Sequence, residues 1–417
     1  MKLSAFGKKF TRHSGILSLM DDLGNAMAND SDMIMMGGGN PAHIPEVETA
    51  FKERLQRILD SQCEFTRLIG TYDPPQGEKG FISELARFLN RHYGWGISER
   101  NIALTNGSQA AFFMIFNMFA GHYDNHQCKR IQLPLAPEYI GYADSGVKDD
   151  FFIANKPDIE HIDSHIFKYH VDFNHLTIDE STGALCVSRP TNPTGNVLTD
   201  HEIEHLDALA ARHDIPLIID NAYGAPFPSL IFTEARLNWN ENTILCLSLS
   251  KLGLPATRTG IVIASEQIIN ALSGMNAIMN LAPNSFGSLL ALDMVRDDSI
   301  RPLCQNVIRP YYEEKAKFAI HCLKRHMTGI PWRIHKPEGS MFLWLWFKDL
   351  PVSSLALYEA LKARGVLVVS GHYFFPGITD GWQHKYECLR ITFTQDSTSV
   401  DKGISIIAKE VRKLYGM

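Results

Sequence analysis

Short, almost continuously apolar runs alternate with helix-like stretches between about residue 46 and residue 290, and this alternation limits the folds that the chain can adopt. The apolar runs cover residues 102–104, 131–133, 184–188, 216–220, 244–249 and 260–264. A strand that helices cover on both faces needs no polar side, so its sequence is apolar throughout. Strands that alternate with helices are typical of a mainly parallel sheet between helical layers. The sequence therefore predicts a large α/β domain built on such a sheet.

The rest of the chain predicts a smaller α+β domain at the C-terminal end. In a chain of 417 residues, one large and one smaller domain is the natural expectation. Helices are expected near 310–327, 353–363 and 400–415, and strands near 341–347, 366–369 and 388–393. We therefore expect an N-terminal arm over 1–45, a large domain over 46–300 and a small domain over 301–417. The arm, which contains a short helical pattern over 16–23, would contribute to the small domain and to the entrance of the functional site.

The composition of the chain argues against several classes of function. A net charge of −6 and a pI near 6.3 do not suit a nucleic-acid or membrane-surface protein. The seven cysteines are scattered and form no CxxC pair, which fits reduced thiols in the cytoplasm better than disulfides or zinc ligands. The first ten residues lack the apolar core of a signal sequence, and no apolar stretch is long enough to cross a bilayer. We expect a cytoplasmic protein without a metal site.

Polar residues cluster directly after the predicted strands. In an open α/β sheet, ligands bind at the carboxyl ends of the strands. The residues that follow these strands include Ser108, Gln109, Asn192, Asp220, Tyr223, Ser248, Lys251 and Arg258. Ser108 and Gln109 precede a predicted helix over 110–119, where backbone N–H groups and the helix dipole attract an anion; a turn with an N-cap is the alternative. The pattern predicts a ligand site at this edge of the sheet.

Lys251 is the most informative of these residues. It follows the apolar run 244–249 and lies in a loop of small residues, with Ser248 before it and Arg258 seven positions after it. Most lysines are solvated surface charges. A lysine that enters a loop after a buried strand, however, is suited to form a Schiff base with a carbonyl compound. Since the guanidinium of Arg258 is a planar partner for a phosphate, the combination predicts the anchor of pyridoxal 5'-phosphate.

Further residues suit the ring of this cofactor. Asp220 would hold a proton on the pyridine nitrogen, which makes the ring an electron sink, although most acids at strand ends are solvated or cap a helix. Tyr223 and Asn192 are able to hydrogen-bond the phenolic oxygen of the ring. Tyr139 could supply a flat surface against the ring, but a packed loop tyrosine is an equal alternative, and Tyr142 competes for the role.

Arg390 stands inside the apolar segment 388–393. A buried arginine needs a carboxylate partner, and the carboxylate of a substrate would provide one. A position at the edge of the sheet that faces solvent is the alternative.

In their order along the chain, these residues resemble the fold-type I pyridoxal-phosphate enzymes, the aspartate aminotransferase superfamily, over essentially the whole sequence. The segments that carry the resemblance are 136–142, 188–196, 249–255, 335–339, 342–347 and 371–377. These longer strings are most similar to the members that exchange amino groups between valine and pyruvate. The chain departs from the usual pattern at Ala256, where relatives commonly have glycine, and at Pro74-Pro75, which is a stiffer turn than usual.

The resemblance implies a role for each residue at the cofactor. Lys251 would form the Schiff base and move a proton between the substrate α-carbon and the cofactor. Asp220 would pair with the pyridinium, Tyr223 and Asn192 with the phenolic oxygen, and Tyr139 would stack on the ring. The phosphate would lie among Ser108, Gln109, Ser248 and Arg258.

The resemblance also implies a homodimer with shared active sites. Tyr72 is similar to the tyrosine that reaches the phosphate bound by the partner subunit. A site built between two identical subunits requires a symmetric dimer.

Substrate recognition follows from the same resemblance. Arg390 would bind the substrate α-carboxylate, helped by the N–H of Gly39 and by Asn192. We see no arginine for a second substrate carboxylate, and the residues expected near the entrance, Ile16, Leu17, Tyr373 and Phe374, are apolar or aromatic. The expected reaction moves an amino group between an aliphatic amino acid (L-valine or L-alanine) and a 2-oxo acid (pyruvate or 3-methyl-2-oxobutanoate). Another aminotransferase of the superfamily, a C–S β-lyase, and a non-catalytic regulatory protein on the same scaffold are the alternatives.

Overall fold

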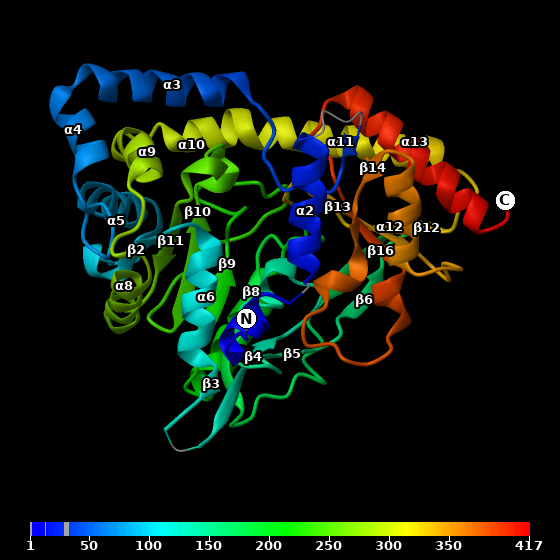
Figure 1. The fold of residues 1–417 in the computed structure, drawn as a ribbon, viewed down its shortest axis with the longest axis horizontal. Coiled ribbons are helices and arrows are strands. Elements are labelled where there is room, and N and C mark those ends of the chain that lie inside the picture. Colours follow the sequence, from blue (N-terminus) through cyan, green and yellow to red (C-terminus); the bar gives the residue numbers. More distant parts are fainter. Residues whose placement is uncertain (1, 13, 29–32, 125) are drawn as a thin grey trace.

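A mainly parallel sheet of eight strands forms the centre of the computed structural model, which describes residues 2–12, 14–28, 33–124 and 126–417 (Figure 1). The strands are β2 (Ile102–Thr105), β3 (Gly121–His122), β4 (Cys128–Leu133), β5 (Phe152–Ala154), β8 (Thr182–Ser188), β9 (Leu217–Asp220), β10 (Thr243–Ser248) and β11 (Gly260–Ile263). Their order is β2-β11-β10-β9-β8-β4-β3, with β5 beside β4. Neighbours from β10 to β5 run parallel, while β11 and β3 run opposite to their neighbours. The predicted fold class is confirmed.

Helices cover the two faces of this sheet and the second sheet beside it. They are α1 (Ala5–Phe10), α2 (Gly15–Ala28), α3 (Pro45–Asp60), α4 (Gln62–Gly70), α5 (Lys79–Tyr93), α6 (Ser108–Phe119), α7 (Asp200–Arg212), α8 (Glu266–Asn280), α9 (Phe286–Arg296), α10 (Ile300–Leu303), α11 (Arg309–His326), α12 (Ser354–Ala363) and α13 (Ser397–Leu414). The helices expected from the sequence near 16–23, 110–119, 310–327, 353–363 and 400–415 correspond to α2, α6, α11, α12 and α13. In the described part of the chain, no helix is both long and apolar enough to cross a membrane.

Alternate residues of the central strands face two separate apolar cores. In β10, Ile244 and Cys246 join the core under α6 and α8, whereas Leu245 and Leu247 join the larger core on the opposite face. All four side chains are fully buried. This two-sided burial explains why the strands are apolar throughout in the sequence.

The second sheet combines C-terminal strands with a hairpin from the middle of the chain. Its order is β15-β16-β13-β12-β7-β6. The bounds are β6 (Asp158–His161), β7 (Ile166–His170), β12 (Trp332–His335), β13 (Phe342–Phe347), β15 (Val369–Ser370) and β16 (Cys388–Thr392). A separate parallel pair joins β1 (Ile34–Met35) to β14 (Val366–Leu367), so the N-terminal segment lies beside the C-terminal strands. The three-part division of the chain stays a prediction. The hairpin over 158–170 comes from the middle of the sequence, yet it extends the sheet that the C-terminal strands form.

The strand register brings the predicted polar residues together. Ser188, Asp220 and Ser248 stand at the carboxyl ends of the adjacent strands β8, β9 and β10, and Ser188 pairs directly with Asp220 across the ladder. Because parallel strands end at the same edge, the loops that follow them meet there. Arg390 reaches the same place from β16 of the second sheet.

Leu245→Ala should lower the free energy of unfolding by about 2–5 kcal/mol, because it leaves a cavity in the centre of the large core. Urea denaturation followed by circular dichroism measures the change. Leu355→Ala is the matched control, since this leucine is 37% exposed, and its loss should be much smaller. Equal losses for the two variants would contradict the description of β10 as a central core strand.

Candidate active site

A cavity of about 170 Å³ lies at the carboxyl edge of the central sheet and opens towards a larger cleft of about 910 Å³. Its lining includes almost all the residues singled out in the sequence: Gly39, Ser108, Gln109, Tyr139, Asn192, Asp220, Tyr223, Ser248, Lys251, Arg258 and Arg390. Among the residues expected to bind the cofactor or the α-carboxylate, Tyr72 is not in the lining; it lies on the surface after α4 with 82% of its area exposed. Ile16 also lines the cavity, and Leu19 and Met20 of α2 join it where Leu17 was expected. Leu17 is mainly exposed, Phe374 is buried beside Arg390, and Tyr373 faces a neighbouring cleft.

Lys251 extends its amine into this cavity from a short 3-10 helix after β10. The Nζ atom donates a hydrogen bond of 2.6 Å to the carbonyl of Gly39 in the N-terminal arm. Burial lowers the pKa of Lys251 to about 8, and the positive charges of Arg390 and Arg258 add to the effect, while Asp220 opposes it. A lysine with this pKa holds far more neutral amine near neutral pH than a surface lysine, and the neutral amine is the nucleophilic form.

Asp220 ends β9 almost completely buried. Its Oδ2 accepts a hydrogen bond of 2.7 Å from the hydroxyl of Tyr142, and its Oδ1 accepts one of 3.0 Å from the N–H of Ala222. Burial raises the pKa of Asp220, and these hydrogen bonds and the charge of Lys251 partly offset the rise. No ion pair to Asp220 occurs among the described residues, so a buried carboxylate faces the cavity without a cationic partner in contact. A protonated ring nitrogen is a group that would complete it.

The two tyrosines that competed in the sequence have different positions. Tyr142 is fully buried, with its ring packed 5.0 Å from Phe112 and 5.1 Å from Phe116, and its hydroxyl bound to Asp220. Tyr139 lines the cavity and meets the ring of Tyr142 edge-on at 5.4 Å. Only Tyr139 of this pair therefore presents a ring to the cavity. The contact of Tyr142 with Asp220 was missed from the sequence, which offers only its spacing of three residues from Tyr139.

The start of α6 and Arg258 form a cradle for an anion. Gly107 is the N-cap residue, has a φ of +86°, and provides no side-chain cap to the first turn. A Cβ atom at Gly107 would lie 2.2 Å from Nη2 of Arg258, so only glycine lets the guanidinium approach the helix start. Ser108, Gln109 and Ser248 line the same end of the cavity. A helix N-terminus, a guanidinium and hydroxyl groups together suit a phosphate.

Arg390 is buried at the opposite side of the cavity. Its Nη1 donates to Oδ1 of Asn192 at 2.8 Å and its Nη2 to the carbonyl of Gly37 at 2.6 Å, while the guanidinium lies 4.2 Å from the ring centre of Phe342. Burial lowers the pKa of Arg390 to about 10. Within the described residues, the Nε atom of Arg390 has no hydrogen-bond partner. The guanidinium also forms no ion pair with a carboxylate of these residues. Of the two alternatives for Arg390, the structure shows the buried one, which needs an anion.

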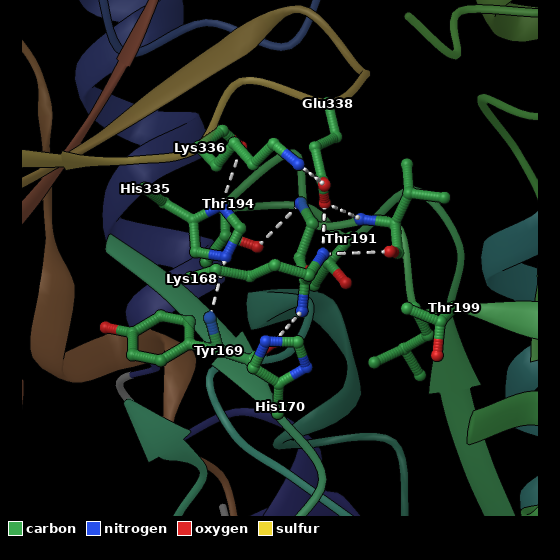
Figure 2. A network of polar contacts seen from close by, with 12 residues as sticks. Lys168, Tyr169, His170, Thr191, Thr194, Thr199, His335, Lys336 and Glu338 are labelled. Atoms are coloured by element: carbon green, nitrogen blue, oxygen red, sulfur yellow. Dashed lines mark hydrogen bonds and ion pairs between the residues drawn. The ribbon is translucent and has the colours of Figure 1, made fainter. Parts of the chain in front are cut away.

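A buried polar network holds the loop that carries Asn192 (Figure 2). Lys168 of β7 forms an ion pair with Glu338 and donates to Oδ1 of Asn196 at 2.9 Å and to the carbonyl of Val197 at 3.0 Å. Oε2 of Glu338 also accepts a hydrogen bond of 3.1 Å from the N–H of Val197. The network joins three segments that are far apart in the sequence, and it was not predicted. It fixes the loop over 191–197 and with it the amide that orients Arg390.

Comparison with known proteins agrees with this geometry. The profile of the family "Aminotransferase class I and II" matches residues 152–407. Valine–pyruvate aminotransferase of Escherichia coli (strain K12) is 50% identical to this chain over 415 residues, covering 100% of this chain and 99% of its own length. This chain belongs to the class I and II aminotransferase family.

Two solved structures of aminotransferases are similar along almost their whole length. A putative amino-acid aminotransferase from Psychrobacter arcticum 273-4 has a TM-score of 0.97 at 49% identity, covering 100% of this chain and 99% of its own. Valine-pyruvate aminotransferase AvtA from Salmonella typhimurium LT2 has a TM-score of 0.89 at 48% identity, covering 96% of this chain and 100% of its own. The resemblance to the aspartate aminotransferase superfamily is therefore confirmed.

The cofactor of an aminotransferase of this family is pyridoxal 5'-phosphate, and the residues of the cavity fit it. The fit rests on three groups that lack a counter-charge in the described structure: the Asp220 carboxylate, the Arg258 guanidinium at the helix start, and the buried Arg390 guanidinium. A cofactor with a protonated ring nitrogen and a phosphate supplies the first two counter-charges, and a substrate carboxylate supplies the third. The individual residue assignments remain a proposal.

Lys168→Met should lower the free energy of unfolding by about 3 kcal/mol, the lower end of the range for breaking a buried ion pair. Lys336, 2.9 Å from the other oxygen of Glu338, still partly balances the carboxylate in this variant. The double variant K168M/E338Q removes both charges and should lose less than K168M alone. Denaturant titration of the three proteins measures the difference, and a larger loss in the double variant would contradict the role of the ion pair.

Proposed function

We propose that this aminotransferase is a valine–pyruvate transaminase, which exchanges the amino group between L-valine and pyruvate to give 3-methyl-2-oxobutanoate and L-alanine. One observation carries the choice of substrate. The cationic side chains that line the cavity in the described structure are Lys251, Arg258 and Arg390. If Lys251 holds the cofactor and Arg258 its phosphate, Arg390 remains for the α-carboxylate and no cation is left for a second acidic group. The similarity to valine–pyruvate aminotransferases over the full chain supports the same assignment.

The side-chain end of the cavity supports an aliphatic substrate. Ile16, Leu19 and Met20 project from α2 into the lining, together with Ile140 and Tyr139. A branched aliphatic side chain gains free energy of binding when this apolar surface covers it, whereas a second carboxylate would be buried there without a partner. The wall therefore favours valine over glutamate or aspartate.

The residues of the chain divide the work of the reaction. When bound, pyridoxal 5'-phosphate supplies an electron-withdrawing ring that stabilises negative charge at the substrate α-carbon. The Nζ atom of Lys251 would take the proton from the substrate α-carbon and deliver it to the cofactor carbon that receives the amino group, for which a pKa near the operating pH is favourable. Asp220 would keep the ring nitrogen protonated, and Arg390 would hold the substrate carboxylate so that the C–H bond to be broken is aligned. Tyr139, Tyr223 and Asn192 surround the ring and hold its position.

The absorption spectrum of the holoenzyme tests this function. L-Valine should bleach the visible band of the bound cofactor, and excess pyruvate should restore it. Lys251→Ala should reduce turnover by at least about a thousandfold, because the group that moves the proton is lost, while some cofactor still binds. Release of ammonia and pyruvate from cystathionine would indicate a β-lyase instead. Comparable bleaching by glutamate or aspartate would contradict the aliphatic specificity, and multiple turnovers by K251A would contradict the role of Lys251.

The active unit is a homodimer in which Tyr72 completes the site of the partner subunit. Tyr72 and Ile278 are 82% and 90% exposed, and Leu281 is also largely exposed. The side chain of Asn276 donates a hydrogen bond of 3.0 Å to the carbonyl of Pro75, so the loop of Tyr72 lies against the end of α8 that carries these apolar residues. An exposed group of large apolar side chains indicates a protein interface.

The seven free cysteines further support a reducing, cytoplasmic location.

Tyr72→Phe should raise the dissociation constant of pyridoxal 5'-phosphate about tenfold, which corresponds to ~1.5 kcal/mol for a hydrogen bond to a charged group. Equilibrium dialysis measures the affinity, and sedimentation equilibrium measures the dimer. Tyr123→Phe, a change at another exposed tyrosine, is the control and should leave the affinity unchanged. A monomeric protein with full affinity for the cofactor would rule out the shared site.

A further inference from the structure

Glu138 is a fully buried acid directly behind the active site, and the reaction described above does not use it. It precedes Tyr139, and its backbone N–H donates to the carbonyl of Phe374 at 2.8 Å. One carboxyl oxygen, Oε1, accepts a hydrogen bond of 2.8 Å from the N–H of Ser188, and the other, Oε2, is in hydrogen-bond contact with the hydroxyl of Ser188. No lysine, arginine or histidine forms an ion pair with it within the described residues. A carboxylate in this position would be a buried charge without a counter-charge.

A chain of hydrogen bonds leads from Glu138 to Asp220. The hydroxyl of Ser188 lies 3.3 Å from the hydroxyl of Tyr142, and the hydroxyl of Tyr142 donates to Oδ2 of Asp220 at 2.7 Å. All four side chains are 9% exposed or less. Their order in space is therefore Glu138, Ser188, Tyr142, Asp220, and the last of them faces the cavity.

The protonation state of Glu138 decides which way the hydroxyl groups of this chain point. Each hydroxyl has one proton to donate. If Glu138 is neutral, it donates to Ser188, Ser188 donates to Tyr142, and Tyr142 donates to Asp220, so that every donor points towards Asp220. If Glu138 is ionised, Ser188 has to donate to Glu138, and the hydroxyl of Tyr142 loses its donor. Hydrogen bonds in one direction polarise one another and strengthen the last bond of the chain.

The charges around Glu138 favour the neutral form. Burial raises the pKa of Glu138 to about 8, the negative charge of Asp220 adds to the rise, and the two hydrogen bonds from Ser188 oppose it. In the described structure, the other titratable groups that face this region include Tyr139, Tyr142, Cys186 and Cys246, and burial raises the pKa of all four. The cations Lys251 and Arg390 lie on the cavity side of Asp220. Two carboxyl groups so close in a buried site do not both ionise easily, and Asp220 is the one nearer to cations.

We propose that Glu138 remains a neutral carboxylic acid in the working enzyme and, through Ser188 and Tyr142, directs a polarised hydrogen bond at Asp220. Glu138 is then a positioning residue for the carboxylate that holds the cofactor ring. This proposal rests on the role of Asp220 in the proposed function, and it does not depend on which amino acid is the substrate.

Infrared difference spectroscopy of the holoenzyme tests the protonation state directly. At pH 7, the difference between wild type and Glu138→Gln should contain the carbonyl band of a protonated carboxylic acid. Glu202→Gln is the matched control: burial opposes the change, yet hydrogen bonds from His170, Thr199 and Val171 lower the pKa of Glu202 to about 2. Its substitution should therefore remove only carboxylate bands. A carboxylate band in the Glu138→Gln difference would overturn the proposal without affecting the assignment of Asp220 or of the substrate.

The pH dependence of stability gives a second readout, independent of activity. Because the pKa of Glu138 is raised in the folded protein, the stability from its bound proton is full below about 4.5, the value of the free group, and is lost as the pH rises to about 8. Glutamine cannot ionise but keeps one donor and one acceptor. Between pH 5 and pH 8, the unfolding midpoint of wild type in urea should therefore fall relative to that of E138Q. A constant difference across this range would overturn the proposal.

Catalytic pH profiles separate this role from a merely structural one. E138Q should keep the wild-type kcat and cofactor spectrum at pH 7, since the amide also donates to Ser188. Above pH 8, the kcat of wild type should fall relative to that of E138Q, as ionised Glu138 turns the hydroxyl of Ser188 away from Tyr142. Tyr142→Phe breaks the chain of hydrogen bonds next to Asp220. In this background, the difference in kcat between Glu and Gln at position 138 should disappear. Parallel profiles for wild type and E138Q would contradict the proposed direction of the chain.

Discussion

Three cationic side chains around one buried cavity impose the main electrostatic constraint on this enzyme. Lys251, Arg258 and Arg390 lie within the same lining; burial lowers the pKa of the lysine, and the charges of the two arginines add to the effect. Within the described lining of the cavity, the one carboxylate that opposes them is Asp220. Since the described residues leave this excess of positive charge unpaired, the cavity suits anionic groups, which in the proposed function are a phosphate at the helix start and a carboxylate at Arg390. Burial and the two arginines together lower the pKa of Lys251 and so favour its neutral, nucleophilic amine.

Two sheets share the construction of the site. Lys251 and Asp220 follow strands of the central sheet, whereas Arg390 belongs to β16 of the second sheet. The loop over 191–197 connects them, because Asn192 contacts Arg390 and the Lys168–Glu338 pair ties the same loop to β7 and to the turn before β13. The distance between Lys251 and Arg390 therefore depends on buried polar contacts between the two sheets.

The sequence predicts the parts of the site that arise from local rules. Asp220, Ser248 and Lys251 follow apolar strands, and parallel strands bring their ends together, so their meeting follows from the pattern alone. The links that were missed are non-local: Tyr142 to Asp220, Glu138 to Ser188, and Lys168 to Glu338. The hairpin of β6 and β7 was missed because β6 is an exposed edge strand without an apolar pattern. The structure places Tyr72 on the surface, away from the cavity of its own chain, so the role predicted for it depends on the proposed dimer.

The apolar wall of the substrate cavity comes from a helix that takes no part in the proton transfer. Ile16, Leu19 and Met20 all belong to α2, near the start of the chain, while Lys251, Asp220 and Arg390 belong to the two sheets and their loops. In the proposed function, α2 thus helps Tyr139 and Ile140 to select the substrate side chain without supplying a group that moves the proton. Substitutions at Ile16, Leu19 and Met20 would then change which substrate side chain is admitted while leaving Lys251, Asp220 and Arg390 in place.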